Sequence, residues 1–209
     1  MADSPRAPLQ FLAAFLAGFA VLWIVVFTAV WQLHLVPAQA GPWLRMALWF
    51  GAVILWLQWT NQPSPARWLG LATFRLEHMG VMLLFMLFMY GSQLLWANFT
   101  GMAQHRLAHL TAMSWIIAPL ALFLDELLFR GVVQTRLAES LPAAAAILIA
   151  ALLFFLSRVP FWMQGTAPDY FVIISTALAG VICGGLRHWT GSLWPGSGVR
   201  FAHYLGTLA

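Results

Sequence analysis

The stretch Leu124-Asp125-Glu126-Leu127-Leu128-Phe129-Arg130-Gly131 places three charged side chains at the end of an apolar segment that begins near residue 111. Ionisable side chains within a membrane span are costly in free energy, and they mark a functional site by default. Glu126 precedes Arg130 by four residues, the favoured order for an ion pair along one face of a helix. The stretch therefore predicts a helix that carries a polar site in apolar surroundings.

The composition of the whole chain is that of a membrane protein. Of its 209 residues, 62% are apolar and 8% are charged, whereas soluble domains average about 25% charged residues. This excludes a soluble globular enzyme and a disordered chain. The ten basic residues are all Arg and are scattered, so we expect no nucleic-acid-binding surface. Because Cys183 is the single cysteine, an intramolecular disulfide and a cysteine metal site are also excluded.

Seven apolar segments are candidates for membrane spans, which need about 20 mostly apolar residues each. They cover residues 10–34, 43–60, 79–98, 111–129, 142–160, 168–186 and 192–208, the last being short and rich in glycine. We therefore expect an all-α fold, a polytopic membrane bundle of about seven helices. Residues 1–209 would form a single domain, with three spanning helices in residues 1–110 and a core in residues 111–208.

The arginines in the predicted loops indicate the orientation of the chain in the membrane. The side of the N-terminus carries Arg6, Arg67, Arg75, Arg136 and Arg187. The opposite side carries Arg45 and Arg106. Since basic residues concentrate in cytoplasmic loops, we expect the N-terminus inside. The first apolar segment is too long for the core of a signal peptide and is predicted to be an anchor.

A further charged residue, Arg158, lies near the end of another apolar segment, 142–160. Asp125 lies 15 residues before the predicted turn at Ser140, and Arg158 lies 18 residues after it. At about 1.5 Å of rise per residue, the two sit roughly 22 and 27 Å from the turn and can face each other across a helical hairpin. The alternative is that Arg158 and Arg130 reach out to the membrane surface from their helix ends.

At these residues the sequence resembles the CPBP intramembrane proteases, a family that includes the type II CAAX prenyl endopeptidases and the Abi bacteriocin-processing and immunity proteins. Asp125-Glu126-x-x-x-Arg130 resembles the family motif Glu-Glu-x-x-x-Arg. The resemblance covers residues 111–208. It implies a helical integral membrane protein, in a bacterial inner membrane.

Two further motifs stand in the expected order. Phe154-x-x-x-Arg158 stands where the family has Phe-x-x-x-His. Arg200-x-x-x-Tyr204 stands where the family has His-x-x-x-Asn. The three motifs together favour the family fold, while the substitutions within them speak against the family's reaction.

The resemblance implies a role for each of these positions. In the family, the first Glu and the His of the second motif hold and activate a water, and the His and Asn of the third motif stabilise the oxyanion. The family-equivalent catalytic positions here are Asp125, Glu126, Arg130, Arg158, Arg200 and Tyr204. Only Glu126 and Arg130 match. Because Arg stays protonated, Arg158 cannot relay a proton, and the shorter Asp125 displaces its carboxylate by about 1 Å.

These substitutions predict a peptidase-inactive membrane protein that binds or helps assemble a membrane partner, which can be a transmembrane helix, a lipid or a protein complex. An active endopeptidase with altered catalytic residues is the first alternative. Binding of an anionic lipid or a carboxylate is the second, because the inner charges sum to +1; these are Asp125, Glu126, Arg130, Arg158 and Arg200. Expected partners are the lipid bilayer and a membrane protein or transmembrane peptide, with no cofactor and no metal.

The histidines carry weaker signals. His105 and His109 are four residues apart and could share a metal on a helix, but no third ligand is evident nearby, so a polar interfacial face is the favoured interpretation. His203 lies beside the third motif, out of register with it. If the helix bends at Gly198, His203 could replace the missing histidine.

Overall fold

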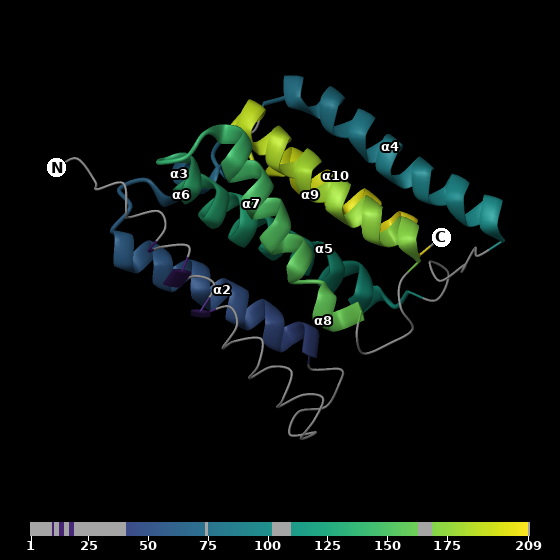
Figure 1. Cartoon of the computed structure of the whole chain (residues 1–209), viewed down its shortest axis with the longest axis horizontal. Coiled ribbons are helices and arrows are strands. Elements are labelled where there is room, and N and C mark those ends of the chain that lie inside the picture. The colour runs from purple at the N-terminus through teal and green to yellow at the C-terminus, as the bar shows by residue number, and fades with distance from the viewer. Residues whose placement is uncertain are drawn as a thin grey trace.

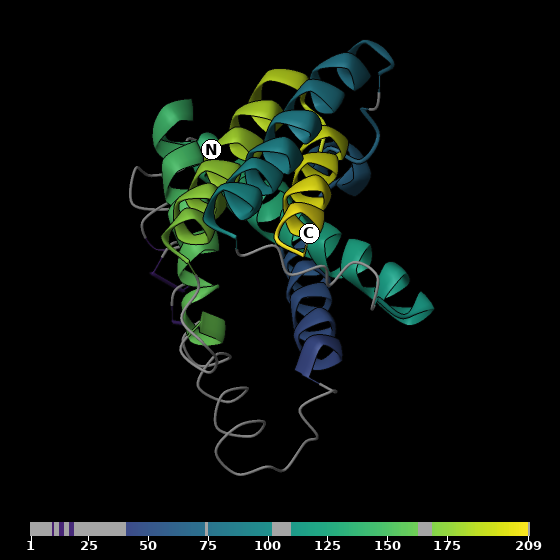
Figure 2. The same ribbon diagram turned by 90° about the vertical axis from the view of Figure 1, so that its right-hand side faces the viewer.

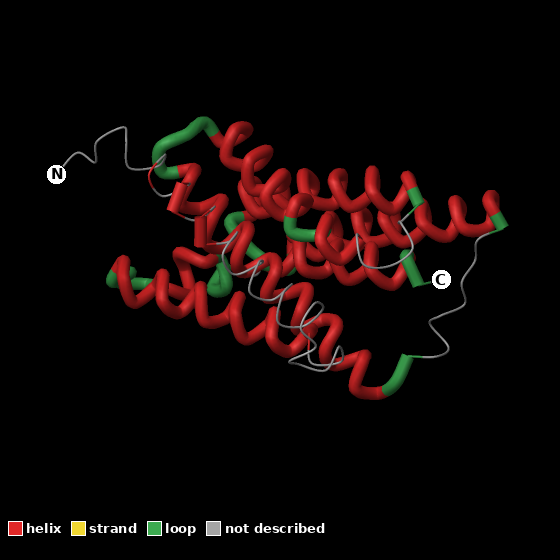
Figure 3. The backbone as a smooth tube through the Cα atoms, turned by 60° about the horizontal axis from the view of Figure 1, so that its bottom comes forward, coloured by secondary structure: helices red, strands yellow, loops and turns green. Residues whose placement is uncertain are grey.

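The computed structural model describes residues 41–73, 75–101, 110–162 and 169–208, together with residues 10, 13, 14, 17 and 18. Every regular element in the described parts is a helix (Figure 3). This confirms the all-α fold class. The predicted first span and the pair His105 and His109 lie outside the described residues.

The helices follow the predicted apolar segments closely. In chain order they are α2 (Gly41–Thr60), α3 (Pro65–Leu69), α4 (Glu77–Thr100), α5 (Ala112–Glu126), a π-helix (Leu127–Gln134), α6 (Thr135–Ala138), α7 (Ala143–Leu156), α8 (Val159–Trp162), α9 (Tyr170–Thr190) and α10 (Trp194–Gly206). The short helix α3, which was not predicted, has Pro65 at its start and ends at Gly70 in the left-handed conformation.

Two of these helices, α4 and α9, are long and apolar enough to cross a membrane. Large apolar side chains project from α4 without cover, among them Leu84, Leu87 and Leu95. A long apolar helix that leaves much of its apolar surface exposed is typical of a membrane span. The membrane character is thereby supported, while a count of seven spans stays a prediction.

The predicted segment 111–129 ends too early. Helical backbone continues through the π-helix and α6 to Ala138. Apolar side chains such as Leu128 and Val133 are buried on this extension, and Gln134 Nε2 donates a hydrogen bond to the carbonyl of Gly184. Packing against α2 and α7, together with this bond to α9, therefore continues the helix beyond the charges, which lie in its middle rather than at its end.

Helices α9 and α10 lie side by side with α4, and α7 packs against α9 (Figures 1 and 2). Glycines allow α10 to approach α4 closely. A Cβ added at Gly198 would lie 2.8 Å from Met82 Sδ, and one at Gly206 would lie 2.7 Å from Gln93 Cβ. Small residues permit this kind of close helix packing in membranes. The contact places the middle of α10 beside the charges of α5.

The loop before α4 fixes the start of α10. The Leu193 amide donates to the Gly70 carbonyl at 3.0 Å, and Thr73 Oγ1 donates to the Gly191 carbonyl at 2.6 Å. These bonds tie the turn between α9 and α10 to a distant part of the chain. As a result, α10 begins at a defined depth in the bundle.

Candidate functional site

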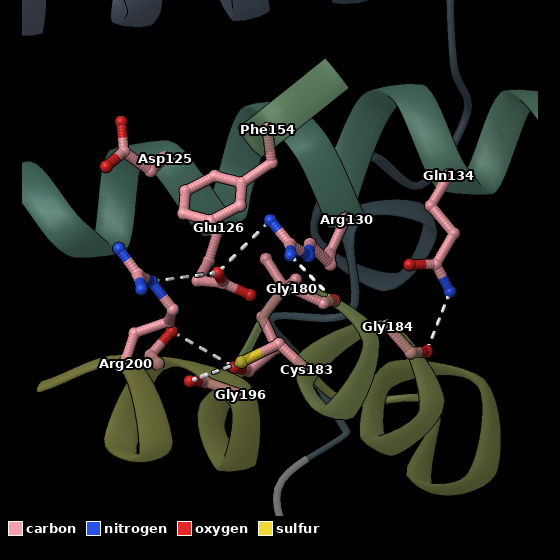
Figure 4. Close-up of polar contacts among 12 residues, drawn as sticks. Asp125, Glu126, Arg130, Gln134, Phe154, Gly180, Cys183, Gly184, Gly196 and Arg200 are labelled. Carbon is pink, nitrogen blue, oxygen red and sulfur yellow. Dashed lines mark hydrogen bonds and ion pairs between the residues drawn. The ribbon is translucent and has the colours of Figure 1, made fainter. Parts of the chain in front are cut away.

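The centre of the candidate site is the pair Asp125 and Glu126 at the end of α5. Both carboxylates are buried, with exposed fractions of 1% and 0%. Adjacent residues of a helix point about 100° apart, and Figure 4 shows the Asp125 side chain pointing away from that of Glu126. The two acids therefore meet different partners.

Cationic and aromatic side chains engage both oxygens of Asp125. Arg158 Nη2 forms an ion pair with Oδ2, and Arg45 Nη2 lies 3.5 Å from the same oxygen. Trp49 Nε1 donates a hydrogen bond to Oδ1 at 3.0 Å. Arg158 thus contacts Asp125 across the helical hairpin, as their similar distances from the turn at Ser140 predict, and does not reach out to the membrane surface.

The position of Arg45 corrects the sequence analysis, which placed this residue in a loop as a marker of orientation. Arg45 lies in α2, its side chain is only 14% exposed, and it faces Asp125. Trp49 follows it by four residues and therefore shares its helix face. That spacing is the one sequence signal by which these two partners could have been found.

Glu126 lies between two other arginines. Its Oε1 is 3.3 Å from Arg130 Nη1 and 3.9 Å from Arg200 Nε. Among the described residues, neither Glu126 oxygen accepts a hydrogen bond, so charge attraction holds the carboxylate. Arg130 Nη2 also donates to the Gly180 carbonyl at 2.8 Å, which fixes the guanidinium between the π-helix and α9 (Figure 4).

Phe154 joins the arginines into one cluster. Its ring is fully buried, and the guanidinium carbons of Arg130, Arg158 and Arg200 lie 4.6, 5.1 and 4.5 Å from its centroid. Guanidinium groups within about 6 Å of an aromatic ring are attracted to its face. The ring of the second motif therefore sits among three positive charges that would otherwise repel one another.

His203 contacts Arg200 and not the acids. Arg200 Nη1 lies 3.3 Å from His203 Nδ1, and Ser175 Oγ lies 3.0 Å from Nε2. Since Arg has donors only, Nδ1 accepts and Nε2 carries the proton toward Ser175. Gln93 Nε2 donates to the same Ser175 oxygen at 2.7 Å. His203 therefore orients Arg200, and a bend at Gly198 is not needed to bring it to the site.

A cavity of about 210 Å³ opens beside this cluster, between α5, α8, α9 and α10. Arg158, Arg200, His203 and Tyr204 contribute its polar lining, and Trp162 and Val172 contribute apolar lining. Tyr204 therefore lines the cavity with the two arginines, and among the described residues its hydroxyl makes no hydrogen bond to either acid. The third-motif positions converge on this space.

The buried charges do not balance. Among the five interior charges expected from the sequence, Arg130, Arg158 and Arg200 stand against Asp125 and Glu126, a sum of +1. The described residues contain no group of three or more His, Cys, Asp and Glu side chains that could hold a metal ion. The site is thus a buried, arginine-rich cluster with a cavity, suited chemically to holding an anion.

Comparison with known proteins agrees with the three motifs. The family model described as type II CAAX prenyl endopeptidase Rce1-like matches residues 107–205. The matched region contains all six family-equivalent positions, from Asp125 to Tyr204. No curated protein and no solved structure matches the chain.

Proposed function

We propose, from the premise that residues 107–205 belong to the Rce1-like family of type II CAAX prenyl endopeptidases, that this chain is a peptidase-inactive member. It would bind a membrane partner through the altered site, in place of cleaving a peptide. The observation that carries this proposal is that both carboxylate oxygens of Asp125 already have protein partners, namely Arg158, Arg45 and Trp49.

A general base must lie within hydrogen-bond reach of the water it activates. At Asp125 a guanidinium occupies that space, and the partner that would be a histidine in the family is Arg158. Because Arg is always protonated, the pair cannot take up a proton and return it. This supports a site that has kept its scaffold and lost the hydrolytic step.

Arg200 could still stabilise negative charge on a bound group. Charge stabilisation without a base supports binding rather than turnover. The exposed apolar side chains of α4 and the cavity lined by α10 favour a partner from the membrane itself, either a lipid or a transmembrane segment. We place the chain in a bacterial inner membrane with its N-terminus inside, as the arginine distribution predicts.

The test is a cleavage assay of the full-length chain in liposomes. Fluorogenic prenylated CAAX-type peptides and transmembrane peptides serve as substrates, and Asp125→Ala serves as the reference variant. We expect no cleavage above that of Asp125→Ala. Robust cleavage by the natural chain that disappears in Asp125→Ala would establish the alternative, an active endopeptidase with altered catalytic residues.

A second arm tests the binding role. The chain is purified from its native membrane in a mild detergent, and its lipid and protein content is measured against the amount of chain. We expect a membrane component in a near-stoichiometric ratio. A preparation that carries neither protein nor lipid above the level of an unrelated membrane protein of similar size contradicts the binding role.

A further inference from the structure

The unbalanced charge of the interior is the starting point. Arg130, Arg158 and Arg200 surround Asp125 and Glu126, which leaves an excess of one positive charge among these five mostly buried side chains. Burying unpaired charge is costly. An anion in the adjacent cavity would relieve that cost, because the arginines would then have counter-charges within a few ångströms.

Arg200 is the group most clearly prepared for such an anion. The residue is 3% exposed and lines the cavity. Its Nη1 lies on His203, its Nε has no hydrogen-bond partner, and its nearest carboxylate oxygen is 3.9 Å away. Arg presents five donors in a planar fork. Part of this fork therefore has no hydrogen-bond partner among the described residues, beside a cavity that is partly open.

A second donor group faces the same cavity. Arg158 lines it and has a buried Nε without a hydrogen-bond partner. Tyr204 adds a hydroxyl that can donate. Two arginines and a phenol around one space are typical of recognition of a phosphate or carboxylate, since the guanidinium fork matches these groups bidentately.

The size and the mixed lining of the cavity narrow the ligand class. A volume of about 210 Å³ is several times the roughly 30 Å³ that one water occupies in the liquid, so a group larger than a water fits. Leu122, Val172 and Trp162 line the space together with the polar groups. A phosphate carried on an apolar body meets both kinds of lining.

We propose that Arg158, Arg200 and Tyr204 bind the phosphate of an anionic phospholipid in this cavity. The inference names the ligand class of the site for which a binding role is proposed above, and it rests on that proposal. A free inorganic phosphate presents the same charged group without the apolar body. The two sources are therefore separated by experiment.

The test measures the melting temperature of the full-length chain in an uncharged detergent, with increasing short-chain phosphatidylglycerol, short-chain phosphatidylcholine or inorganic phosphate. At a ligand concentration near 100 times the dissociation constant we expect phosphatidylglycerol to raise the melting temperature by roughly 5–10 °C. We expect a smaller rise with phosphatidylcholine, whose headgroup carries no net charge, and with inorganic phosphate.

Variants locate the effect. Tyr204→Phe removes one hydroxyl, and Arg200→Lys keeps the charge while it removes the fork; each is expected to weaken the apparent affinity for phosphatidylglycerol at least tenfold. Arg75→Gln is the control, because the Arg75 side chain is 72% exposed and pairs with the exposed Glu77. If Arg200→Lys fails to fold, Tyr204→Phe still decides the question.

Three results overturn the proposal. The first is an equal rise with phosphatidylcholine, and the second is an equal rise with inorganic phosphate, which would make the free ion the ligand. The third is an unchanged affinity in both cavity variants. Failure of the proposed function is a different result. It would be seen as peptide cleavage by the same preparation, and it does not depend on whether lipid raises the melting temperature.

Discussion

Among single residues, Asp125 decides between a catalytic and a structural account of the site. A catalytic carboxylate is often held in an unfavourable state, so removing it is neutral or stabilising. A paired carboxylate behaves in the opposite way, because its removal strands the buried partner. Asp125 faces Arg158 and Arg45, and Glu126 faces Arg130 and Arg200.

We therefore expect Asp125→Ala and Glu126→Ala each to destabilise the protein, by roughly 3–5 kcal/mol. The double variant Asp125→Leu with Arg158→Leu should recover much of the loss, since an apolar pair leaves one fewer stranded charge. Melting curves in one detergent measure this. Glu77→Gln is the matched control, because its carboxylate is exposed. A melting temperature of Asp125→Ala at or above that of the parent contradicts the ion-pair account.

Phe154 is the second residue whose role can be tested directly. Its ring lies within 5.1 Å of three guanidinium carbons. Phe154→Leu keeps most of the apolar volume and removes the aromatic face, so we expect a loss of about 1–3 kcal/mol beyond that of a comparable Phe→Leu change. Phe155→Leu provides the comparison, since Phe155 is half-buried and its ring contacts Trp162. Equal losses in the two variants would remove the cation–aromatic interpretation.

At the scale of helices, the contact between α9 and the π-helix positions Arg130. Arg130 and Gln134 donate to the carbonyls of Gly180 and Gly184, one helical turn apart on α9. A side chain at Gly184 would intrude here, because its Cβ would lie 2.9 Å from Ile147 Cγ2 and 3.1 Å from Gln134 Oε1. The neighbouring Gly185 has nothing within 4 Å of such a Cβ.

This pair of adjacent glycines gives a matched test of the contact. Gly184→Ala should lower the free energy of unfolding by about 1–3 kcal/mol through overpacking. Gly185→Ala should be neutral or stabilise by up to roughly 1 kcal/mol, because Ala is the better helix former. Thermal unfolding of both variants measures the difference. Equal responses would show that α9 does not pack closely at Gly184.

The helices and three motifs followed from the sequence because apolar runs and fixed spacings are local signals. The spacing between Asp125, Ser140 and Arg158 was enough to place the two charges together. The partners from α2 were not foreseen, because Arg45 reaches Asp125 through tertiary packing alone. The π-helix was also missed, since a π-helical turn has no hydrophobic periodicity of its own in the sequence.

For the whole molecule, the arrangement of helices predicts which loops face the same side of the membrane. The loop that holds Ser64 lies beside α3, at the end of the bundle where α4 begins, and Ala112 starts α5 after α4 has crossed the bundle (Figure 1). Ser64 and Ala112 are both exposed, and Cys183 is fully buried. Single cysteines introduced at the two exposed positions can thus be labelled to determine the membrane topology, because the buried Cys183 is not expected to react.

We expect a membrane-impermeant maleimide to label Ala112→Cys in intact cells and to label Ser64→Cys only after the membrane is opened. The reason is that an N-terminus inside, together with a first span in residues 10–34, puts the loop at Ser64 in the cytoplasm and the start of α5 outside. The parent chain, with Cys183 alone, is the control and should stay unlabelled in both conditions. Labelling of Ser64→Cys in intact cells with protection of Ala112→Cys would reverse the orientation. Labelling of both positions in intact cells would show that α4 does not cross the membrane. It would also contradict the interpretation that the apolar surface of α4 faces lipid.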